Sequence, residues 1–288
     1  MHERRAGSPV PPELVESFRR DGFVVVPDLL ETNALLHFGK CVDAAVAERQ
    51  RRSRPLEERT RYEQSFLQSI NLWEDHPDVR PLSFHPRVAE AAAHLLGVEG
   101  LRLWHDQALY KEPGGRETDA HQDQPYWPMR EADALTAWIP FDDVRDEHGR
   151  MGYVPGSHRL GLRRFVNIFL GEPEDVLARP ELAGRAPVFV DVPRGAVAFH
   201  HSLTVHCARP NRSERMRRVH TMIFFRDGAT RGSEKHPHPC VDRAGLREGE
   251  PIASDVTPIA WPRPDGRLPP RPSHPMPKDY FGRHVWPE

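Results

Sequence analysis

The stretch Asp119-Ala120-His121-Gln122-Asp123-Gln124-Pro125-Tyr126-Trp127 sets a histidine and a carboxylate two residues apart. On a β-strand this spacing puts the side chains of His121 and Asp123 on one face, so that a ring nitrogen and a carboxylate oxygen can converge on one point. A metal ion is the natural occupant of that point. Non-haem Fe(II) sites use two histidines and one carboxylate, and they leave the opposite positions of the ion open. The rest of the chain must therefore supply a second histidine.

The composition excludes several classes of protein. The 288 residues carry a net charge of −2, which gives no basic field for nucleic acid. The three cysteines are widely spaced and form no Cys-x-x-Cys pair, so neither a disulfide framework nor a zinc knuckle is indicated. The N-terminus is polar, and no apolar run approaches the ~18 residues needed to span a bilayer. We expect a cytoplasmic protein that has a small-molecule substrate and neither a nucleic-acid nor a membrane partner.

Helical patterns come first along the chain, and β patterns follow. Apolar spacing and end signals predict helices at 11–20, about 32–52 and 86–96. A strand is expected between the first two helices, at 23–26, and residues 55–85 are expected to form a loop or short helix over the core. Further strands are expected at 101–111, 135–141, 151–154, 188–192, 196–206 and 218–225.

This order predicts a mainly β protein with additional α-helices. Many short strands at hairpin spacing favour a double-stranded β-helix, which is the cupin-like jelly roll, with helices packed on one side. We expect a single domain over residues 1–288. Its N-terminal helical layer is expected at about 11–97, and a proline-rich tail at about 228–288. Oligomeric state cannot be inferred from the sequence.

The strand expected at 196–206 offers three candidates for the second histidine, namely His200, His201 and His206. We choose His206 because it sits at a strand end where a loop begins. Arg217 follows eleven residues later, which is far enough for the chain to turn back beside the histidine. A guanidinium inside a jelly roll needs an anion, and its planar fork matches a carboxylate. That anion could be the distal carboxylate of 2-oxoglutarate, whose keto-acid end would chelate the metal.

With these residues placed, the sequence resembles the phytanoyl-CoA dioxygenase family of Fe(II)/2-oxoglutarate oxygenases. The likeness extends from about residue 21 to residue 225. It is strongest at His121-Gln122-Asp123, at Pro155-Gly156-Ser157-His158, and at His206 followed by Asn211, Ser213 and Arg217. The second of these motifs is interpreted as structural, with a glycine that permits a tight connection and a histidine that caps a loop.

The resemblance implies a set of site residues. His121, Asp123 and His206 would bind Fe(II), and Arg217 would grip the distal carboxylate of 2-oxoglutarate. Gln107 or Tyr110, and also Trp138, match family positions that line the cosubstrate, although an ordinary place in the core is an equal alternative for them. Two departures from the family pattern are visible. Alanine follows Gly195 where aspartate is usual, and Cys207-Ala208 stands where a glycine and a small hydroxyl residue are common.

These residues together predict a hydroxylase that acts on a small organic molecule, such as an acyl thioester or a secondary metabolite. Fe(II) would be the metal cofactor. The reaction would consume 2-oxoglutarate and O2, hydroxylate an unactivated C–H bond, and release succinate and CO2. The presence of Asp123 favours oxygen insertion, desaturation or ring chemistry over halogenation. Two alternatives stay open: a jelly-roll binding or scaffold module without redox turnover, and a metal-dependent, cupin-type isomerase or hydrolase that would not need Arg217.

Overall fold

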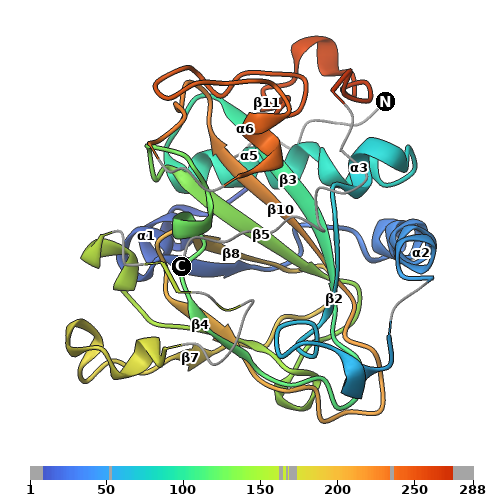
Figure 1. The fold of residues 1–288 in the computed structure, drawn as a ribbon, viewed down its shortest axis with the longest axis vertical. Helices are drawn as coiled ribbons and strands as arrows, with labels where there is room; N and C mark the ends of the chain where they lie inside the picture. The colour runs from blue at the N-terminus through green and yellow to red at the C-terminus, as the bar shows by residue number, and fades with distance from the viewer. Residues whose placement is uncertain are drawn as a thin grey trace.

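The chain forms two antiparallel β-sheets of unequal size, as the computed structural model shows (Figure 1). The structure describes residues 9–51, 54–161, 165–166, 168, 174–233 and 237–274. The larger sheet has the order β1 (Phe23–Val26), β8 (Val197–His201), β5 (Ala134–Pro140), β10 (Val219–Arg226), β3 (Leu101–Tyr110) and β11 (Ile259–Trp261), with β2 (Leu67–Ile70) also paired to β3. The smaller sheet has the order β4 (Thr118–His121), β9 (His206–Ala208), β6 (Met151–Tyr153) and β7 (Val188–Phe189). The expectation of a mainly β jelly roll is confirmed.

Most α-helices in the described part of the chain precede β3, and one lies near the C-terminal end. The α-helices are α1 (Pro12–Asp21), α2 (Thr32–Arg49), α3 (Leu72–Asp75), α4 (Arg80–Ser83), α5 (Pro86–Leu96) and α6 (Pro239–Asp242). The 3-10 turns are η1 (Leu56–Glu58), η2 (Gln124–Tyr126), η3 (Asp146–His148), η4 (Ser157–Leu160), η5 (Val176–Ala178), η6 (Pro180–Leu182) and η7 (Pro264–Gly266). No helix among these described residues combines the length and the apolarity that a membrane crossing demands.

The larger sheet separates an apolar layer from the interior of the roll. Alternate residues of a strand point to opposite faces. On β5, Leu135, Ala137 and Ile139 pack with helices α1, α2 and α5 in one apolar cluster, so Thr136 and Trp138 point the other way. The same alternation continues on β8 and β10. The inward-facing residues of these strands are the ones that can build a site.

A β-bulge changes the alternation on β3. Ile223 on β10 pairs with His105, but the next residue of β10 pairs with Leu103, so Trp104 is an extra residue in the ladder. Because of this insertion, Trp104 and His105 both leave the apolar layer of the helices, whereas Asp106 contacts α3 and α4. A bulge of this kind redirects side chains next to a site.

Several predicted boundaries differ from the structure. The helix expected at about 32–52 ends at Arg49. The strand expected at 196–206 is two strands, β8 and β9, which belong to different sheets, and His206 begins β9 instead of ending a strand. The segment 55–85 contains β2, α3 and α4 in addition to η1. Within the expected tail, β11 pairs with β3 (Figure 1), and the part after residue 274 lies outside the described residues.

Glycine at position 22 fixes the end of α1 against the loops of the roll. Gly22 ends the helix with a left-handed φ of 83°. A β-carbon there would collide with the side chains of His158 and Thr204. The carbonyl of Gly22 accepts a hydrogen bond of 2.8 Å from the Thr204 hydroxyl. Only glycine satisfies both the backbone conformation and the space, so the first helix is tied to the loop that precedes β9.

Candidate metal centre

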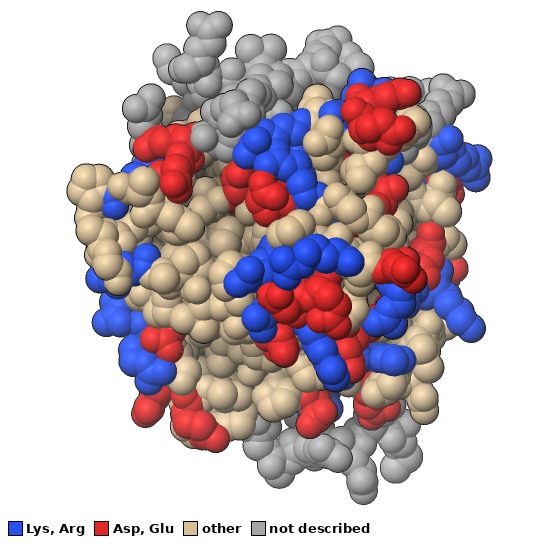
Figure 2. Space-filling model, turned by 90° about the horizontal axis from the view of Figure 1, so that it is seen from below, with Lys and Arg blue, Asp and Glu red and all other residues tan. Residues whose placement is uncertain are grey.

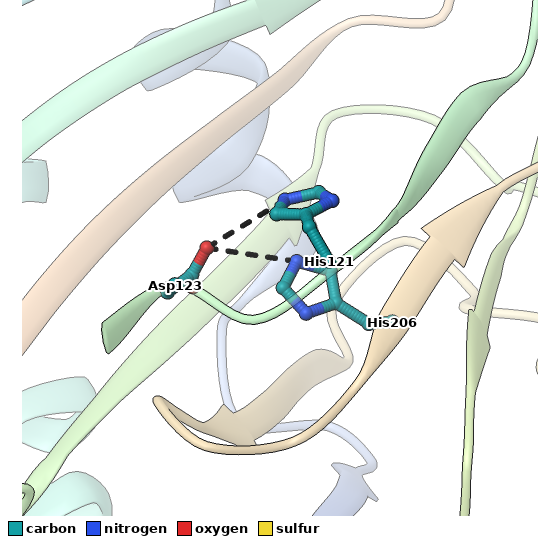
Figure 3. Close-up of side chains that lie close together, drawn as sticks. All are labelled: His121, Asp123 and His206. Carbon is teal, nitrogen blue, oxygen red and sulfur yellow. Dashed lines mark ion pairs between the residues drawn. The ribbon is translucent and has the colours of Figure 1, made fainter. Parts of the chain in front are cut away.

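His121, Asp123 and His206 meet at one point of the interior (Figure 3). Each offers one ligand atom, and the three atoms lie within 4.8 Å of one another. The Oδ1 atom of Asp123 is 3.8 Å from Nε2 of His121 and 3.6 Å from Nε2 of His206. This is a compact set of two nitrogen donors and one oxygen donor, open to binding one ion between them.

Strand pairing brings the two histidines together. His121 ends β4 and His206 begins β9, and the two residues are register partners in the smaller sheet. Asp123 does not lie on the strand as the two-residue spacing suggested. It occupies the turn before η2 with φ −76° and ψ −40°, and its amide donates a 3.1 Å hydrogen bond to the carbonyl of Ser202. The convergence was predicted correctly, but a turn held by the β8–β9 loop produces it.

Backbone carbonyls select the ring nitrogen that faces the site. Nδ1 of His121 donates to the carbonyl of Asp119 at 2.7 Å, and Nδ1 of His206 donates to the carbonyl of Thr204 at 2.9 Å. In both rings the lone pair is therefore on Nε2, the atom directed at Asp123. Metal-binding histidines are usually oriented in this way, through a hydrogen bond from the ring nitrogen that does not bind the metal.

The second oxygen of the carboxylate is occupied by two further donors. The hydroxyl of Thr136 donates to Oδ2 of Asp123 at 2.9 Å, and Nε2 of His200 donates to the same atom at 3.2 Å. Oδ1 is thereby left as the atom that faces the two histidines. The carboxylate is held in one orientation before any ion arrives.

The charges of the site suit a cation. Burial, together with the proximity of His206, lowers the pKa of His121 to about 4, and burial with His200 nearby lowers that of His206 to about 4. Both imidazoles are therefore neutral near pH 7. Burial alone would raise the pKa of Asp123, but His206 and the hydrogen bond from His200 hold it well below its ordinary value. The result is one anionic and two neutral donors, a set that fits a divalent ion such as Fe(II).

The three side chains line a cavity of about 760 Å³. Strand register orders its wall in rows. In one row, Thr221 on β10 pairs with Gln107 on β3 and with Trp138 on β5. In the next row, Ile223 on β10 pairs with His105 on β3 and with Thr136 on β5. Aromatic side chains form another part of the wall, among them Tyr62, Phe66, Tyr126, Trp127 and His238. A molecule in the cavity would therefore contact a polar wall near Trp138 and an aromatic wall elsewhere.

Arg217 differs from the other arginines that line the cavity. Each of the three others pairs with a carboxylate: Arg49 with Asp75, Arg54 with Glu63 and Arg59 with Glu112. Arg217 is 4% exposed and pairs with no carboxylate among the described residues. Its Nη1 donates to the carbonyl of Gly149 at 2.6 Å, and its guanidinium carbon lies 5.5 Å from the Trp138 ring centre. Burial lowers the pKa of Arg217 to about 10, which leaves it charged near neutral pH and in need of an anion.

Charged groups on the outer surface are arranged differently. On the face shown in Figure 2, basic and acidic side chains are interspersed, and neither sign gathers into an extended patch. Surface pairs of this kind contribute little individually. Arg217 differs from such surface charges, because it is buried and has no carboxylate partner among the described residues.

Only some of the residues that the resemblance assigns to the cosubstrate line the cavity. Gln107 and Trp138 line the cavity, and Gln107 accepts a 2.6 Å hydrogen bond from the side chain of Gln68. Tyr110 does not reach the cavity. It packs in the apolar layer of the helices, where its hydroxyl donates to Asp43 at 2.6 Å. Gln107 and Tyr110 are three residues apart on one strand, so they point to opposite faces.

Sequence reasoning missed Thr136 and His200 as partners of Asp123. Both come from the larger sheet, where they are register partners on β5 and β8. Their spacing from His121 along the chain carries no signal. Thr136 lies two residues before Trp138 on the same strand, so the two side chains point to the same face. This is the only sequence feature that could have identified Thr136.

The Pro155-Gly156-Ser157-His158 motif lies outside the metal site and supports the loop before His206. The Ser157 hydroxyl accepts a 2.9 Å hydrogen bond from the amide of Val205. Nε2 of His158 lies 3.2 Å from the carbonyl of Arg19, the residue two before the end of α1. These contacts connect α1 to the start of β9, in keeping with a structural interpretation of the motif.

Comparison with known proteins agrees with this geometry. A family model described as phytanoyl-CoA dioxygenase matches residues 18–219. The chain belongs to the phytanoyl-CoA dioxygenase family. Within the family's wider fold, a solved structure described as the non-heme alpha-ketoglutarate-dependent carbocyclase SnoK from nogalamycin biosynthesis is 29% identical. Its TM-score is 0.72, and the match covers 87% of this chain and 96% of that one.

Two further proteins are similar to this member of the dioxygenase family. The epimerase SnoN, solved in complex with Fe3+, alpha-ketoglutarate and nogalamycin RO, is 27% identical with a TM-score of 0.68, over 86% of this chain and 97% of that one. A probable alpha-ketoglutarate-dependent hypophosphite dioxygenase of Stutzerimonas stutzeri is 30% identical over 136 residues, which are 46% of this chain and 47% of the relative. The chain thus matches about half the length of this curated relative.

Proposed function

We propose that this protein is an Fe(II)- and 2-oxoglutarate-dependent oxygenase that hydroxylates an unactivated C–H bond of a small organic molecule. One observation carries the proposal. Two neutral imidazoles and one carboxylate converge in a cavity that also contains a buried arginine without a carboxylate partner among the described residues. A metal site alone suits many reactions, whereas a metal site with an unpaired cation in the same cavity suits a cosubstrate that is both a chelator and an anion.

The residues have separate tasks in this proposal. Nε2 of His121, Nε2 of His206 and Oδ1 of Asp123 would hold Fe(II), and Arg217 would pair with the distal carboxylate of 2-oxoglutarate. Fe(II) would supply the redox chemistry in which O2 and 2-oxoglutarate become succinate and CO2 and one oxygen atom enters the substrate. Thr136 and His200 keep Asp123 in position, and Trp138 and Gln107 line the cosubstrate side. The aromatic wall would orient the substrate and exclude water.

The outcome at the substrate carbon is a second part of the proposal. The relatives described as a carbocyclase and an epimerase are also alpha-ketoglutarate-dependent. Ring closure or epimerisation therefore stands beside hydroxylation as a candidate outcome. Mass spectrometry of the product distinguishes them, because hydroxylation adds an oxygen atom, ring closure removes two hydrogens and epimerisation leaves the mass unchanged.

The test is a coupled assay for succinate. Anaerobically purified protein is loaded with Fe(II), mixed with 2-oxoglutarate and a panel of small molecules, and exposed to air. We expect succinate in amounts that match product formation for at least one substrate class. Arg217→Ala should raise the KM for 2-oxoglutarate by about a hundredfold, the effect of leaving a carboxylate without its charged partner. Turnover that needs no 2-oxoglutarate and survives Arg217→Ala would instead support the cupin-type isomerase or hydrolase. Iron binding without turnover on any substrate would support the scaffold alternative.

A further inference from the structure

The bulge on β3 turns a histidine toward the cavity that has no place in the metal centre. His105 lines the cavity and is 8% exposed. Its Nδ1 atom is enclosed by protein and has no hydrogen-bond partner among the described residues. Nε2 is therefore the ring nitrogen left for a molecule in the cavity. Buried polar groups normally have a partner, so a ring in this position calls for an explanation.

Helix α6 and the residue before it hold this histidine in place. The ring of His238 lies at 26° to that of His105 with centroids 6.2 Å apart, and it stacks on Trp104 at 4.5 Å. The amide of Cys240 donates to Nδ1 of His238 at 3.2 Å, and its thiol donates to the carbonyl of Trp104 at 2.9 Å. His105 thus has a defined place in the wall before any ligand arrives, which favours the recognition of one particular group.

Strand register places His105 in the row of the wall that reaches the metal centre. Ile223 pairs with His105 on one side and with Thr136 on the other. Thr136 in turn donates to Asp123. Burial lowers the pKa of His105 to about 4, although Asp106 and Asp123 oppose this change. The ring is therefore neutral near pH 7, and a hydroxyl group can pair with it in either tautomer, because a hydroxyl both donates and accepts.

Charged side chains on the described cavity wall already have partners. Arg49, Arg54 and Arg59 each pair with a carboxylate. Glu63, which also lines the cavity, is the partner of Arg54. Arg217 is assigned to the cosubstrate in the proposed function. Outside the metal centre, this wall thus has no spare charge for a phosphate, carboxylate or ammonium group of a substrate. Burying a charge without a partner is costly, so the wall favours an uncharged substrate.

Aromatic rings contribute to the wall beside the metal centre. The ring of Tyr126 lies at 62° to that of His121 with centroids 6.0 Å apart. Tyr62 and Phe66 meet edge to face at 5.2 Å, and Trp127 also lines the cavity. Aromatic rings pack favourably against other rings in offset or edge-to-face arrangements. Such a wall favours a substrate that contains a flat ring system.

We propose that His105 is a specificity-determining residue, whose Nε2 forms a hydrogen bond with a hydroxyl group of an uncharged aromatic substrate. The proposal rests on the proposed function and deepens it by naming the substrate class. The aromatic wall would hold the ring system, and the hydrogen bond to His105 would fix which edge of the molecule faces the metal centre. Of the two classes expected from the sequence, an acyl thioester of coenzyme A does not fit, because its phosphates would need cations that this wall does not offer.

The first experiment compares small probes that share one ring system and differ in one group. Equilibrium dialysis of the protein with Fe(II) and 2-oxoglutarate, under anaerobic conditions, gives dissociation constants for 2-naphthol, 2-methylnaphthalene, 2-naphthoate and 2-(aminomethyl)naphthalene. We expect 2-naphthol to bind about tenfold more tightly than 2-methylnaphthalene, which is the effect of one hydrogen bond in a buried site. The anionic and cationic probes should bind more weakly than either, because their charges would be buried without partners.

The second experiment assigns the hydrogen bond to His105. His105→Phe keeps a ring in place but removes both nitrogens, so it should abolish the preference for 2-naphthol and leave the binding of 2-methylnaphthalene unchanged. His105→Asn restores a polar group and should recover part of the preference. His238→Phe is the matched control, since it makes the same change in the adjoining ring, and it should keep the preference. Thermal unfolding and iron content check that each variant folds and holds the metal.

The outcomes separate this proposal from the proposed function. A preference for 2-naphthol that survived in folded His105→Phe, or that was lost equally in His238→Phe, would overturn the role of His105. A charged probe that bound as tightly as 2-naphthol, or a failure of every probe to bind, would overturn the substrate class. Succinate release with an acyl thioester in the coupled assay would preserve the proposed function and refute this inference. Absence of iron binding would refute the proposed function, while the probes could still be measured on metal-free protein.

Discussion

The hydroxyl of Thr136 donates a 2.9 Å hydrogen bond to Oδ2 of Asp123, and His200 approaches the same oxygen from the neighbouring strand at 3.2 Å. The two donors are register partners on β5 and β8 of the larger sheet. Asp123 lies two residues after the end of β4, which belongs to the smaller sheet. The contact therefore joins the two sheets at the metal site. It also leaves Oδ1 as the oxygen directed at the histidines.

Removing the Thr136 hydroxyl should weaken metal binding. Thr136→Val keeps the shape of the side chain but leaves Oδ2 with one donor, so the carboxylate can rotate before an ion binds. Loss of such a supporting contact typically lowers metal affinity by about 10- to 100-fold. Titration with Fe(II) under anaerobic conditions measures the dissociation constant. Thr136→Ser serves as the matched control, and an affinity of Thr136→Val equal to that of wild type would show that the carboxylate needs no such support.

Removing a metal ligand should abolish iron binding without unfolding the protein. His121→Ala, Asp123→Ala and His206→Ala each leave two donors, too few for stable binding of Fe(II) in this site. Equilibrium dialysis followed by metal analysis measures bound iron, and circular dichroism checks the fold. His37→Ala, at an exposed position of α2, is the control for the loss of a histidine. Stoichiometric iron in any of the three variants would remove that residue from the ligand set.

The buried carboxylate of Asp106 should stabilise the attachment of α3 and α4 to the sheet. Its Oδ2 accepts a 2.6 Å hydrogen bond from the Ser83 hydroxyl and a 3.0 Å bond from the amide of Trp73, and Nε2 of His220 lies 3.4 Å away. Asp106 and Ser83 are completely buried. Asp106→Ala leaves these donors unpaired and should lower the free energy of unfolding by about 3 kcal/mol, whereas Ser83→Ala should cost about 1 kcal/mol. Urea denaturation measures both, and equal effects would contradict this order.

Acid should destabilise the protein partly through His85. Burial, with Arg87 and Arg263 nearby, lowers the pKa of His85 to about 4, so the folded protein holds this ring in its neutral form. The unfolded chain binds a proton near pH 6.5, and the stabilising contribution is therefore present above that pH and is lost as pH falls toward 4. The loss amounts to at most about 3 kcal/mol. His85→Gln should show a correspondingly shallower decline in unfolding free energy between these pH values, and identical pH profiles would exclude the effect.

Much of the fold and the convergence of His121, Asp123 and His206 could be predicted because these features have local signals. A helix end, the alternation of a strand and the His121-Gln122-Asp123 spacing can each be read from a short stretch of sequence. The choice of His206 over His200 rests on two grounds, a position at a strand end and the place of Arg217 eleven residues later. The first ground is wrong, because His206 begins β9. His200 nevertheless belongs to the site as a donor to Asp123. A sequence shows that histidines are close along the chain, but sheet pairing decides which of them bind a metal and which orient a ligand.

The remaining features depend on contacts between distant strands. Tyr110 and Gln107 could not both face the cavity, because three residues separate them on one strand. The bulge at Trp104 brings His105 inward, and no local pattern announces that shift. Pairing of Thr118 with Ala208 likewise joins residues ninety positions apart. Such relationships follow from the register of the sheets, which the order of strands alone does not determine.

Part of the cavity wall comes from outside the residues that the family model matches. The family match ends at residue 219, yet Pro237, His238 and Pro239 line the cavity, and the His238 ring stacks on Trp104 with centroids 4.5 Å apart. The segment that carries His121, Asp123 and His206 and this wall are thus separate stretches of the polypeptide. A change at His238 therefore alters the surface met by a bound molecule without touching the segment that carries His121, Asp123 and His206.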